Sequence, residues 1–175
     1  MSRANLINAA LFQTTWFACV LGGAAGSSLW GAAALLGLLT FSARSPHLRA
    51  DLRLAAAAAV IGFALDTLWI HLGVLDYHGI AFAPAWIVLL WVAVGLTLNH
   101  SLSLFAGRPW LGGVLAGACA PLSYLGGERL GAVAVPDPWL LALVAAAWFF
   151  TFALAFALAG DGAIALRRQP YERAH

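Results

Sequence analysis

The sequence is poor in charge: Asp, Glu, Lys and Arg make up 9% of its 175 residues, and lysine is absent. About 25% is usual in globular domains, so a soluble fold of this size could not cover its surface with so few charges. All nine basic residues are arginines, too few and too scattered for a nucleic-acid interface. The scarcity of charge therefore excludes a soluble domain, a disordered chain and a nucleic-acid-binding protein.

Cysteine is also scarce, and clustered metal ligands are missing. Cys19 and Cys119 both fall inside apolar runs, where cysteine behaves as a small hydrophobic residue. The five histidines form no His-x-x-His or similar cluster. We therefore predict no disulfide, no metal and no cofactor.

Apolar residues dominate what is present, at 63% of the chain. A spanning helix needs about 20 predominantly apolar residues, so the length allows six or seven spans and no extramembrane domain. The pattern predicts one all-α transmembrane domain over residues 1–175, a bundle of six spans with a short tail at 160–175. The predicted spans cover about 7–25, 27–43, 54–75, 82–102, 110–133 and 139–159.

The arginines predict the orientation of these spans. With six spans, eight of the nine arginines fall on one side, and the opposite loops hold no arginine. Arginine is enriched in cytoplasmic loops. We therefore predict a multi-pass protein of the bacterial inner membrane with both termini in the cytoplasm.

The first apolar run has a second interpretation. Arg3, an apolar stretch and the small residues 22–26 resemble a signal peptide, whose removal would leave five spans. Asn8, Gln13 and Thr14 interrupt the stretch, which favours a retained span.

Polar residues at depth are the informative ones, because each costs energy in lipid unless it is paired or wetted. Helix rise places them in two groups. The predicted outer zone combines Asp66, Tyr124, Glu128, Arg129 and His71. The predicted inner zone combines Asn99, His100 and Ser101 with Asn5 or Asn8.

The outer zone has two interpretations that the sequence leaves open. Arg129 could neutralise Glu128 or Asp66 and fix the third helix against the fifth. Two carboxyl groups and one cation would still leave one carboxyl over, which favours a site with Asp66 and Glu128 as catalytic candidates. Tyr124 and Arg129 would then bind a ligand.

The inner zone is also open to two interpretations. Asn99 and His100 are candidate ligand-binding residues, or they form an interfacial hydrogen-bonding cap at a helix end.

The fifth predicted span is rich in glycine. Gly113/Gly117 and Gly127/Gly131 form small-xxx-small stripes, which permit close helix packing or binding of a homo- or hetero-oligomeric partner. Pro121 lies inside this span and predicts a kinked or broken helix with freed carbonyl groups.

Several stretches resemble a known family. They read "NAALFQTTWFACVLG" (8–22), "APAWIVLLWVAVGLTLNHSL" (83–102) and "GACAPLSYLGGERLGAV" (117–133), together with Asp66 before "GVL" (73–75). They resemble a family of small polytopic inner-membrane proteins of bacteria that is a domain of unknown function. The resemblance covers most of the chain and implies no catalytic residues. Genes of this family often lie near those for cyclopropane fatty-acid synthesis and photo-oxidative stress, which favours lipid handling.

These observations predict a membrane protein that binds or modifies a lipid or other amphipathic molecule at the outer zone, with membrane lipids as its partners. Two alternatives stay open: a small proton-coupled transporter using Asp66, and a non-catalytic assembly subunit that binds partners through the glycine stripes. Whether the protein is an enzyme is left open by the sequence.

Overall fold

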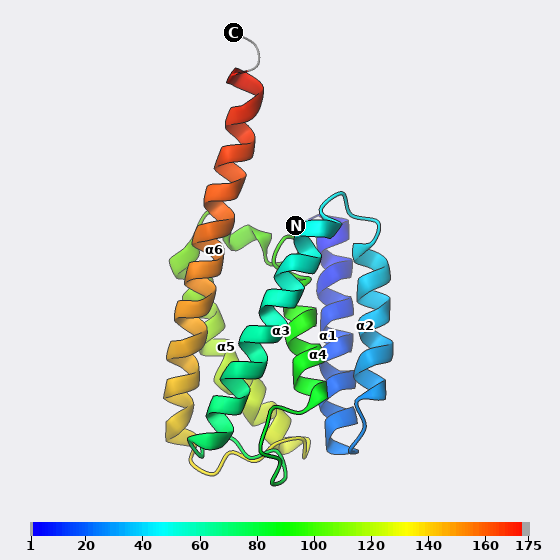
Figure 1. Cartoon of the computed structure of the whole chain (residues 1–175), viewed down its shortest axis with the longest axis vertical. Coiled ribbons are helices and arrows are strands. Elements are labelled where there is room, and N and C mark those ends of the chain that lie inside the picture. Colours follow the sequence, from blue (N-terminus) through cyan, green and yellow to red (C-terminus); the bar gives the residue numbers. More distant parts are fainter. Residues whose placement is uncertain (1, 173–175) are drawn as a thin grey trace. The chain divides into compact units, whose positions relative to one another are not determined.

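The computed structural model describes the backbone of residues 2–172 and the side chains of residues 2–157. Its helices are α1 (Arg3–Ala24), α2 (Leu29–Ser42), α3 (Leu48–His71), α4 (Ala85–Gly95), α5 (Pro109–Arg129) and α6 (Leu141–Glu172), with 3₁₀ helices η1 (Ser103–Phe105) and η2 (Pro138–Leu140) (Figure 1). Across residues 2–172 no strand forms, and the predicted all-α class is confirmed.

Three of these helices are long and apolar enough to cross a membrane. They are Arg3–Ala24, Leu48–His71 and Pro138–Ala157, whereas α2 and α4 are apolar but shorter. The apolar helices thus indicate a membrane protein. Six spans, and the side on which each terminus lies, stay predictions.

The structure corrects the bounds of several predicted helices, and the sixth runs to Glu172 instead of ending near residue 159. The third begins at Leu48 rather than near residue 54, so its first turn includes Asp51. The fourth is confined to Ala85–Gly95 and does not continue to residue 102. Beyond it the chain forms tight turns, in which the Thr97 carbonyl oxygen accepts hydrogen bonds from the backbone N–H groups of His100 and Leu102. Side chains 99–101 therefore leave the helix axis and reach other helices.

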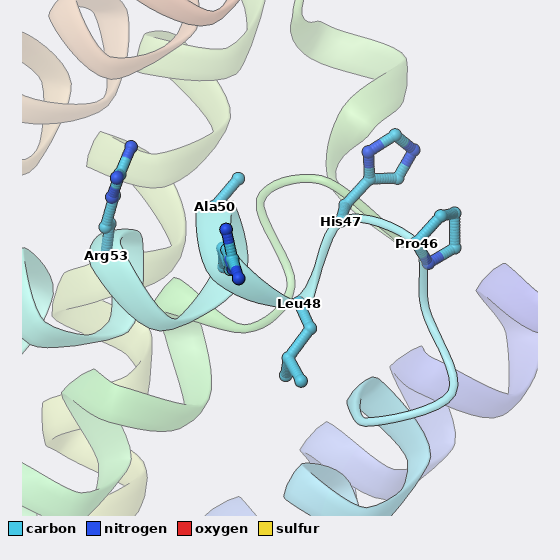
Figure 2. A pocket seen from close by; sticks show the side chains of 6 residues that line it. Pro46, His47, Leu48, Ala50 and Arg53 are labelled. Carbon is cyan, nitrogen blue, oxygen red and sulfur yellow. The ribbon is translucent and has the colours of Figure 1, made fainter.

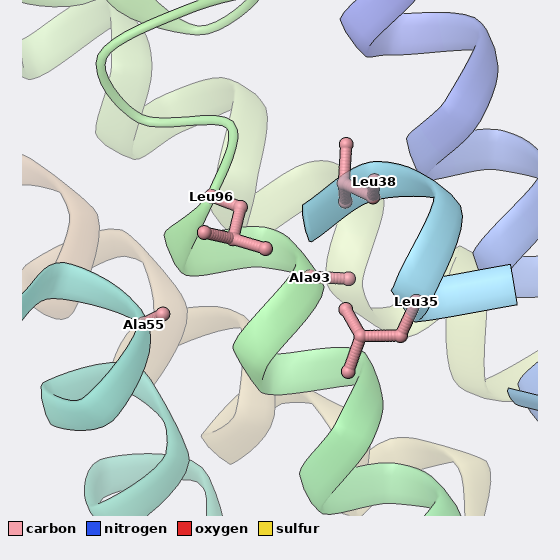
Figure 3. Packing of buried hydrophobic residues seen from close by; sticks show 5 residues of the cluster. All are labelled: Leu35, Leu38, Ala55, Ala93 and Leu96. Carbon is pink, nitrogen blue, oxygen red and sulfur yellow. The ribbon is translucent and has the colours of Figure 1, made fainter. Parts of the chain in front are cut away.

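Residues 2–103 and 124–138 form one compact unit, in which α4 packs against α1, α2 and α3 (Figure 1). Its apolar core contains residues from α2, α3 and α4 and the residue that follows α4, namely Leu35, Leu38, Ala55, Ala93 and Leu96 (Figure 3). A Cβ at Gly95 would lie 2.5 Å from the Ala55 Cα, so the backbones of α3 and α4 come into direct contact there. Only a residue without a side chain fits at this position.

Two connections of the same unit are joined to each other. Asp76 and Ala134 exchange both backbone hydrogen bonds, at 2.9 and 2.8 Å. A ring nitrogen of His78 lies 3.0 Å from the Gly131 carbonyl oxygen. We name the two connections, residues 72–84 and 130–138, the joined loops. They hold Tyr77 in place beyond the end of α3.

Residues 104–123 and 139–172 form a second compact unit, which contains most of α5 and all of α6. A Cβ at Gly113 or at Gly117 would lie 2.8 Å from a carbonyl oxygen of α6, that of Phe149 or Ala145 respectively. The Gly113/Gly117 stripe is thus occupied by a helix of the same chain.

The remaining features of the predicted fifth span differ from expectation. The helix runs through Pro121 to Arg129 and is therefore not broken there, whereas a kink at Pro121 stays a prediction. Gly131 lies past its end with a positive φ of 82°, so Gly127 and Gly131 do not form a helical stripe. A positive φ is the conformation that glycine adopts at little cost.

Candidate functional site

Asp66 lies on the buried face of α3, and its accessible surface is 0%. This face also contains Asp51, Ala55, Ala58, Gly62 and Trp69. Their spacing of three and four residues is that of one helix face. The residues between the two aspartates on this face are all small, so α4 and the chain that follows it approach α3 closely.

Three side chains donate hydrogen bonds to the Asp66 carboxylate. The hydroxyls of Tyr77 and Tyr124 lie 2.5 and 2.9 Å from Oδ1. The indole Nε1 of Trp91 lies 2.7 Å from Oδ2. These donors come from the joined loops, α5 and α4. We name Asp66, Tyr77, Trp91 and Tyr124 the Asp66 cluster.

The Trp91 indole reaches Asp66 because Gly62 leaves room for it. A Cβ at Gly62 would lie 2.0 Å from the Trp91 Cγ, far inside van der Waals contact. Gly62 is one helical turn before Asp66 on the same face. Tyr77 is in turn packed edge-on against Trp86, with ring centroids 5.6 Å apart.

The Asp66 cluster contains no cation. The contact between His100 and Asp51, which is an ion pair only when the His100 ring is protonated, lies elsewhere. Burial raises the pKa of the Tyr77 phenol well above 10, and the charge of Asp66 raises it further, so this donor stays neutral. A buried carboxylate held by neutral donors alone lacks charge compensation, which is costly in a low-dielectric environment.

The donor types determine where such a carboxyl group could hold a proton. A tyrosine hydroxyl can donate or accept, whereas an indole N–H can only donate. A proton on Oδ1 could therefore be shared with Tyr77 or Tyr124, while Oδ2 keeps accepting from Trp91. The cluster can accommodate both protonation states without moving a helix.

The other members of the predicted outer zone do not join this cluster. Glu128 accepts a hydrogen bond from the Val135 backbone N–H at 2.9 Å and so ties α5 to the joined loops. Arg129 is exposed, and within the described residues no ion pair links it to Glu128 or Asp66. His71 is exposed and its Nδ1 lies 2.8 Å from the Thr67 carbonyl oxygen. The predicted ion-pair staple is therefore not the arrangement found.

The predicted inner zone does come together, around a residue that the sequence did not single out. Asn99 donates to Asp51 Oδ1 at 2.9 Å, and His100 Nε2 lies 2.9 Å from Asp51 Oδ2. Asp51 has an accessible surface of 0%. We name Asp51, Asn99 and His100 the Asp51 cluster.

Asn8 connects α1 to the chain beside this cluster. Its Oδ1 accepts hydrogen bonds from the Ser101 hydroxyl at 2.7 Å and the Ser101 backbone N–H at 3.3 Å. Its amide nitrogen donates to the Leu96 carbonyl oxygen at 3.3 Å. Of the two asparagines considered, Asn8 rather than Asn5 is the one buried here.

Two functional candidates, Asp51 and Tyr77, were missed by sequence reasoning, and Trp91 was not placed in the predicted outer zone. Asp51 lay in a segment that we assigned to a loop, although the small residues 55, 58 and 62 continue the same helix face toward Asp66. Trp91 gave a usable signal, because an indole N–H deep in an apolar run requires an acceptor. Tyr77 gave none, since it lies in a predicted loop.

An open pocket of about 610 Å³ lies elsewhere, at the start of α3 (Figure 2). It is lined by Pro46, His47, Leu48, Arg49, Ala50 and Arg53. The figure shows the His47 side chain projecting from the chain just before α3 and the Arg53 side chain projecting from the helix. None of the predicted site residues lines it. No group of three or more metal-ligand residues occurs in the described part of the chain.

Comparison with protein families identifies the class. A family model described as a protein of unknown function (DUF2878) matches residues 5–154. The chain therefore belongs to this family, which confirms the resemblance seen in the sequence. Neither the curated proteins nor the solved structures include a match to it.

Proposed function

We propose that this protein binds a lipid or other amphipathic molecule beside Asp66 and uses the Asp66 carboxyl group as an acid or base. The observation that carries the proposal is the buried carboxylate held by three neutral donors and no cation. Such a group binds a proton more readily than one neutralised by an arginine, because no fixed positive charge opposes protonation. An ionisable residue is costly to bury in a membrane helix, so we expect one that lies there to have a chemical role.

A second polar atom on the same helix face supports a ligand. The indole N–H of Trp69 is buried and has no hydrogen-bond partner among the described residues. Trp69 lies three residues after Asp66, and its side chain is 5% exposed. Because a buried donor without a partner is costly, an acceptor oxygen on a bound molecule would stabilise it. A carbonyl, carboxyl or ether group near the head of an amphipathic molecule supplies one.

The surface around α3 favours entry from the bilayer. Ile61, Phe63 and Leu68 are each more than two-fifths exposed, on the flanks of the helix that carries Asp66. A molecule that crosses this surface must itself be largely apolar. Arg129, exposed at the end of α5 beyond Tyr124, is our proposed contact for an anionic head group.

The test is mass spectrometry of total lipids from a strain that lacks the gene, complemented with four versions of it. The versions are wild type, Asp66→Asn, Trp69→Phe and the control Asp76→Asn, an exposed carboxylate in the joined loops. We expect deletion to change a lipid species, and wild type and Asp76→Asn to restore it. Asp66→Asn should fail, and Trp69→Phe should restore it in part. Restoration by Asp66→Asn would overturn the acid/base role, and an unchanged lipid profile on deletion would overturn the lipid function.

A proton-coupled transporter is the second candidate function. It is favoured by the two tyrosine hydroxyls on Oδ1 of Asp66. They can donate to the ionised carboxylate, and either can accept a hydrogen bond from the protonated carboxyl group. Proteoliposomes containing the protein would then show uptake of a solute that collapses when the pH gradient is removed. Asp66→Asn should abolish this dependence, and Asp76→Asn should leave it unchanged. Uptake unaffected by Asp66→Asn would count against this candidate.

A further inference from the structure

His100 and Asp51 share a geometry that the Asp66 proposal does not use. The Asp51 carboxylate is buried, and it is held by Asn99 on one oxygen and by the His100 ring on the other. Because an ionised carboxylate can only accept hydrogen bonds, the ring nitrogen facing it must carry the hydrogen. Asp51 therefore fixes Nε2 of His100 as the protonated nitrogen of the neutral ring.

This arrangement leaves Nδ1 as the basic nitrogen. No described residue makes a hydrogen bond to it, and the His100 side chain is 12% exposed, so one edge of the ring is accessible. The rings of His71 and His78 differ, because each lies against a backbone carbonyl oxygen and is exposed. Within the described side chains, His100 is the histidine that a buried carboxylate orients.

We infer that His100 and Asp51 form a second acid/base site, in which Nδ1 of His100 takes up a proton from water and releases it again. Uptake converts the neutral ring into an imidazolium that remains paired with the Asp51 carboxylate, and release restores the lone pair on Nδ1. A carboxylate that sets the tautomer of a histidine and stabilises its imidazolium form is the arrangement used by histidine general bases.

The surroundings favour a role for Asp51 in this exchange. From α3, the charged group facing the ring is Asp51 itself. From the α4–α5 connection and from α1, the polar side chains in this region are neutral, namely Asn99, Ser101, Ser103 and Asn8. Arg49 and Arg53 are exposed and line the pocket at the start of α3. The inference does not rest on the function proposed for Asp66.

Nuclear magnetic resonance of ¹⁵N-histidine in the reconstituted full chain tests the inference. Spectra are recorded from about pH 8 to about pH 5. We expect the neutral ring to give one signal with Nε2 protonated and Nδ1 bare, and acidification to add a proton at Nδ1. The signal should be absent in His100→Gln and present in His71→Gln, the control. In Asp51→Asn the neutral ring should occupy both tautomers, because an amide can present either its carbonyl oxygen or its NH₂ group to the ring.

Two outcomes would overturn the inference. One is a His100 ring whose protonation does not change over this pH range, which would make the pair a purely structural contact. The other is a neutral ring with the hydrogen on Nδ1. Because Asp51→Asn could perturb folding, Asn99→Leu provides a second variant that removes the amide but keeps the pair. It should retain the Nε2 tautomer of the wild type.

Discussion

Two buried carboxylates on one face of α3 are supported in different ways. Asp66 receives its hydrogen bonds from the joined loops, α4 and α5, and all its donors are neutral aromatic side chains. Asp51, about 22 Å away at ~1.5 Å per residue, receives its hydrogen bonds from two consecutive residues of one connection. The difference shows that the Asp66 cluster requires several elements to assemble, whereas the Asp51 cluster requires only that the chain after α4 meets α3.

The same small-residue face makes both arrangements possible. Ala55, Ala58 and Gly62 separate the two aspartates, and Gly95 and Trp91 lie against the first and last of them. Close approach of α3 and α4 thus brings donors to both carboxylates. Changing one small residue should disturb the nearer cluster more than the farther one.

The largest expected effect is that of Asp66→Leu. It leaves two buried hydroxyls and one buried N–H without their acceptor. We expect a loss of about 3–5 kcal/mol in the free energy of unfolding, since each unpaired buried donor costs about 1–3 kcal/mol and the two hydroxyls can partly satisfy each other. Asp51→Leu should cost less, because it strands fewer donors. Thermal unfolding in detergent measures both, and equal losses would contradict the contrast between the clusters.

The next effect is that of Gly62→Ala. Its Cβ would collide with Trp91 and displace the indole from Asp66, so we expect a loss of about 2–3 kcal/mol, in the range of core overpacking. Gly37→Ala in α2 is the matched control, because a Cβ there meets no atom within 4 Å. That control should be neutral or stabilising by up to about 1 kcal/mol. Tryptophan fluorescence, followed through the same unfolding experiment, reports whether Trp91 moves.

A smaller effect is expected from Asn8→Ala beside the Asp51 cluster. It removes hydrogen bonds to Ser101 and Leu96 and should cost about 1–2 kcal/mol. Asn5→Ala, one turn earlier, removes no hydrogen bond made by its side chain in the described residues and should change stability by less than about 0.5 kcal/mol. A similar loss in both variants would show that the two polar residues matter only for the start of α1.

The smallest effect concerns alkaline pH. Because the pKa of Tyr77 is raised in the folded protein, the folded state retains a proton that the unfolded state releases above pH 10. Stability contributed by the neutral phenol is therefore complete below pH 10 and declines as the pH rises further. Tyr77→Phe should show a shallower decline above pH 10 than wild type. Unfolding followed from about pH 9 to about pH 11.5, on both sides of pH 10, measures the slope of this decline.

The sequence predicted the fold class well because composition is a local property. Long apolar stretches with almost no charge must be helical, since lipid cannot satisfy an exposed backbone. Asp66, Tyr124, Asn99 and His100 were recognised for a related reason, as polar groups in apolar runs. Their partners were harder to find. Tyr77 and Asp51 lie in segments that read as loops, and no spacing rule connects them to residues far along the chain.

The sequence by itself therefore determined that this is an all-α, strongly apolar chain of its family with polar residues where polarity is costly. Only the tertiary structure decided which polar residues meet. It paired Asp66 with aromatic donors rather than with Arg129, and it joined His100 to Asp51. The physical reason is that hydrogen-bond partners are selected by helix approach, which the glycines at 62 and 95 permit, and close approach depends on the shape of both helices at once.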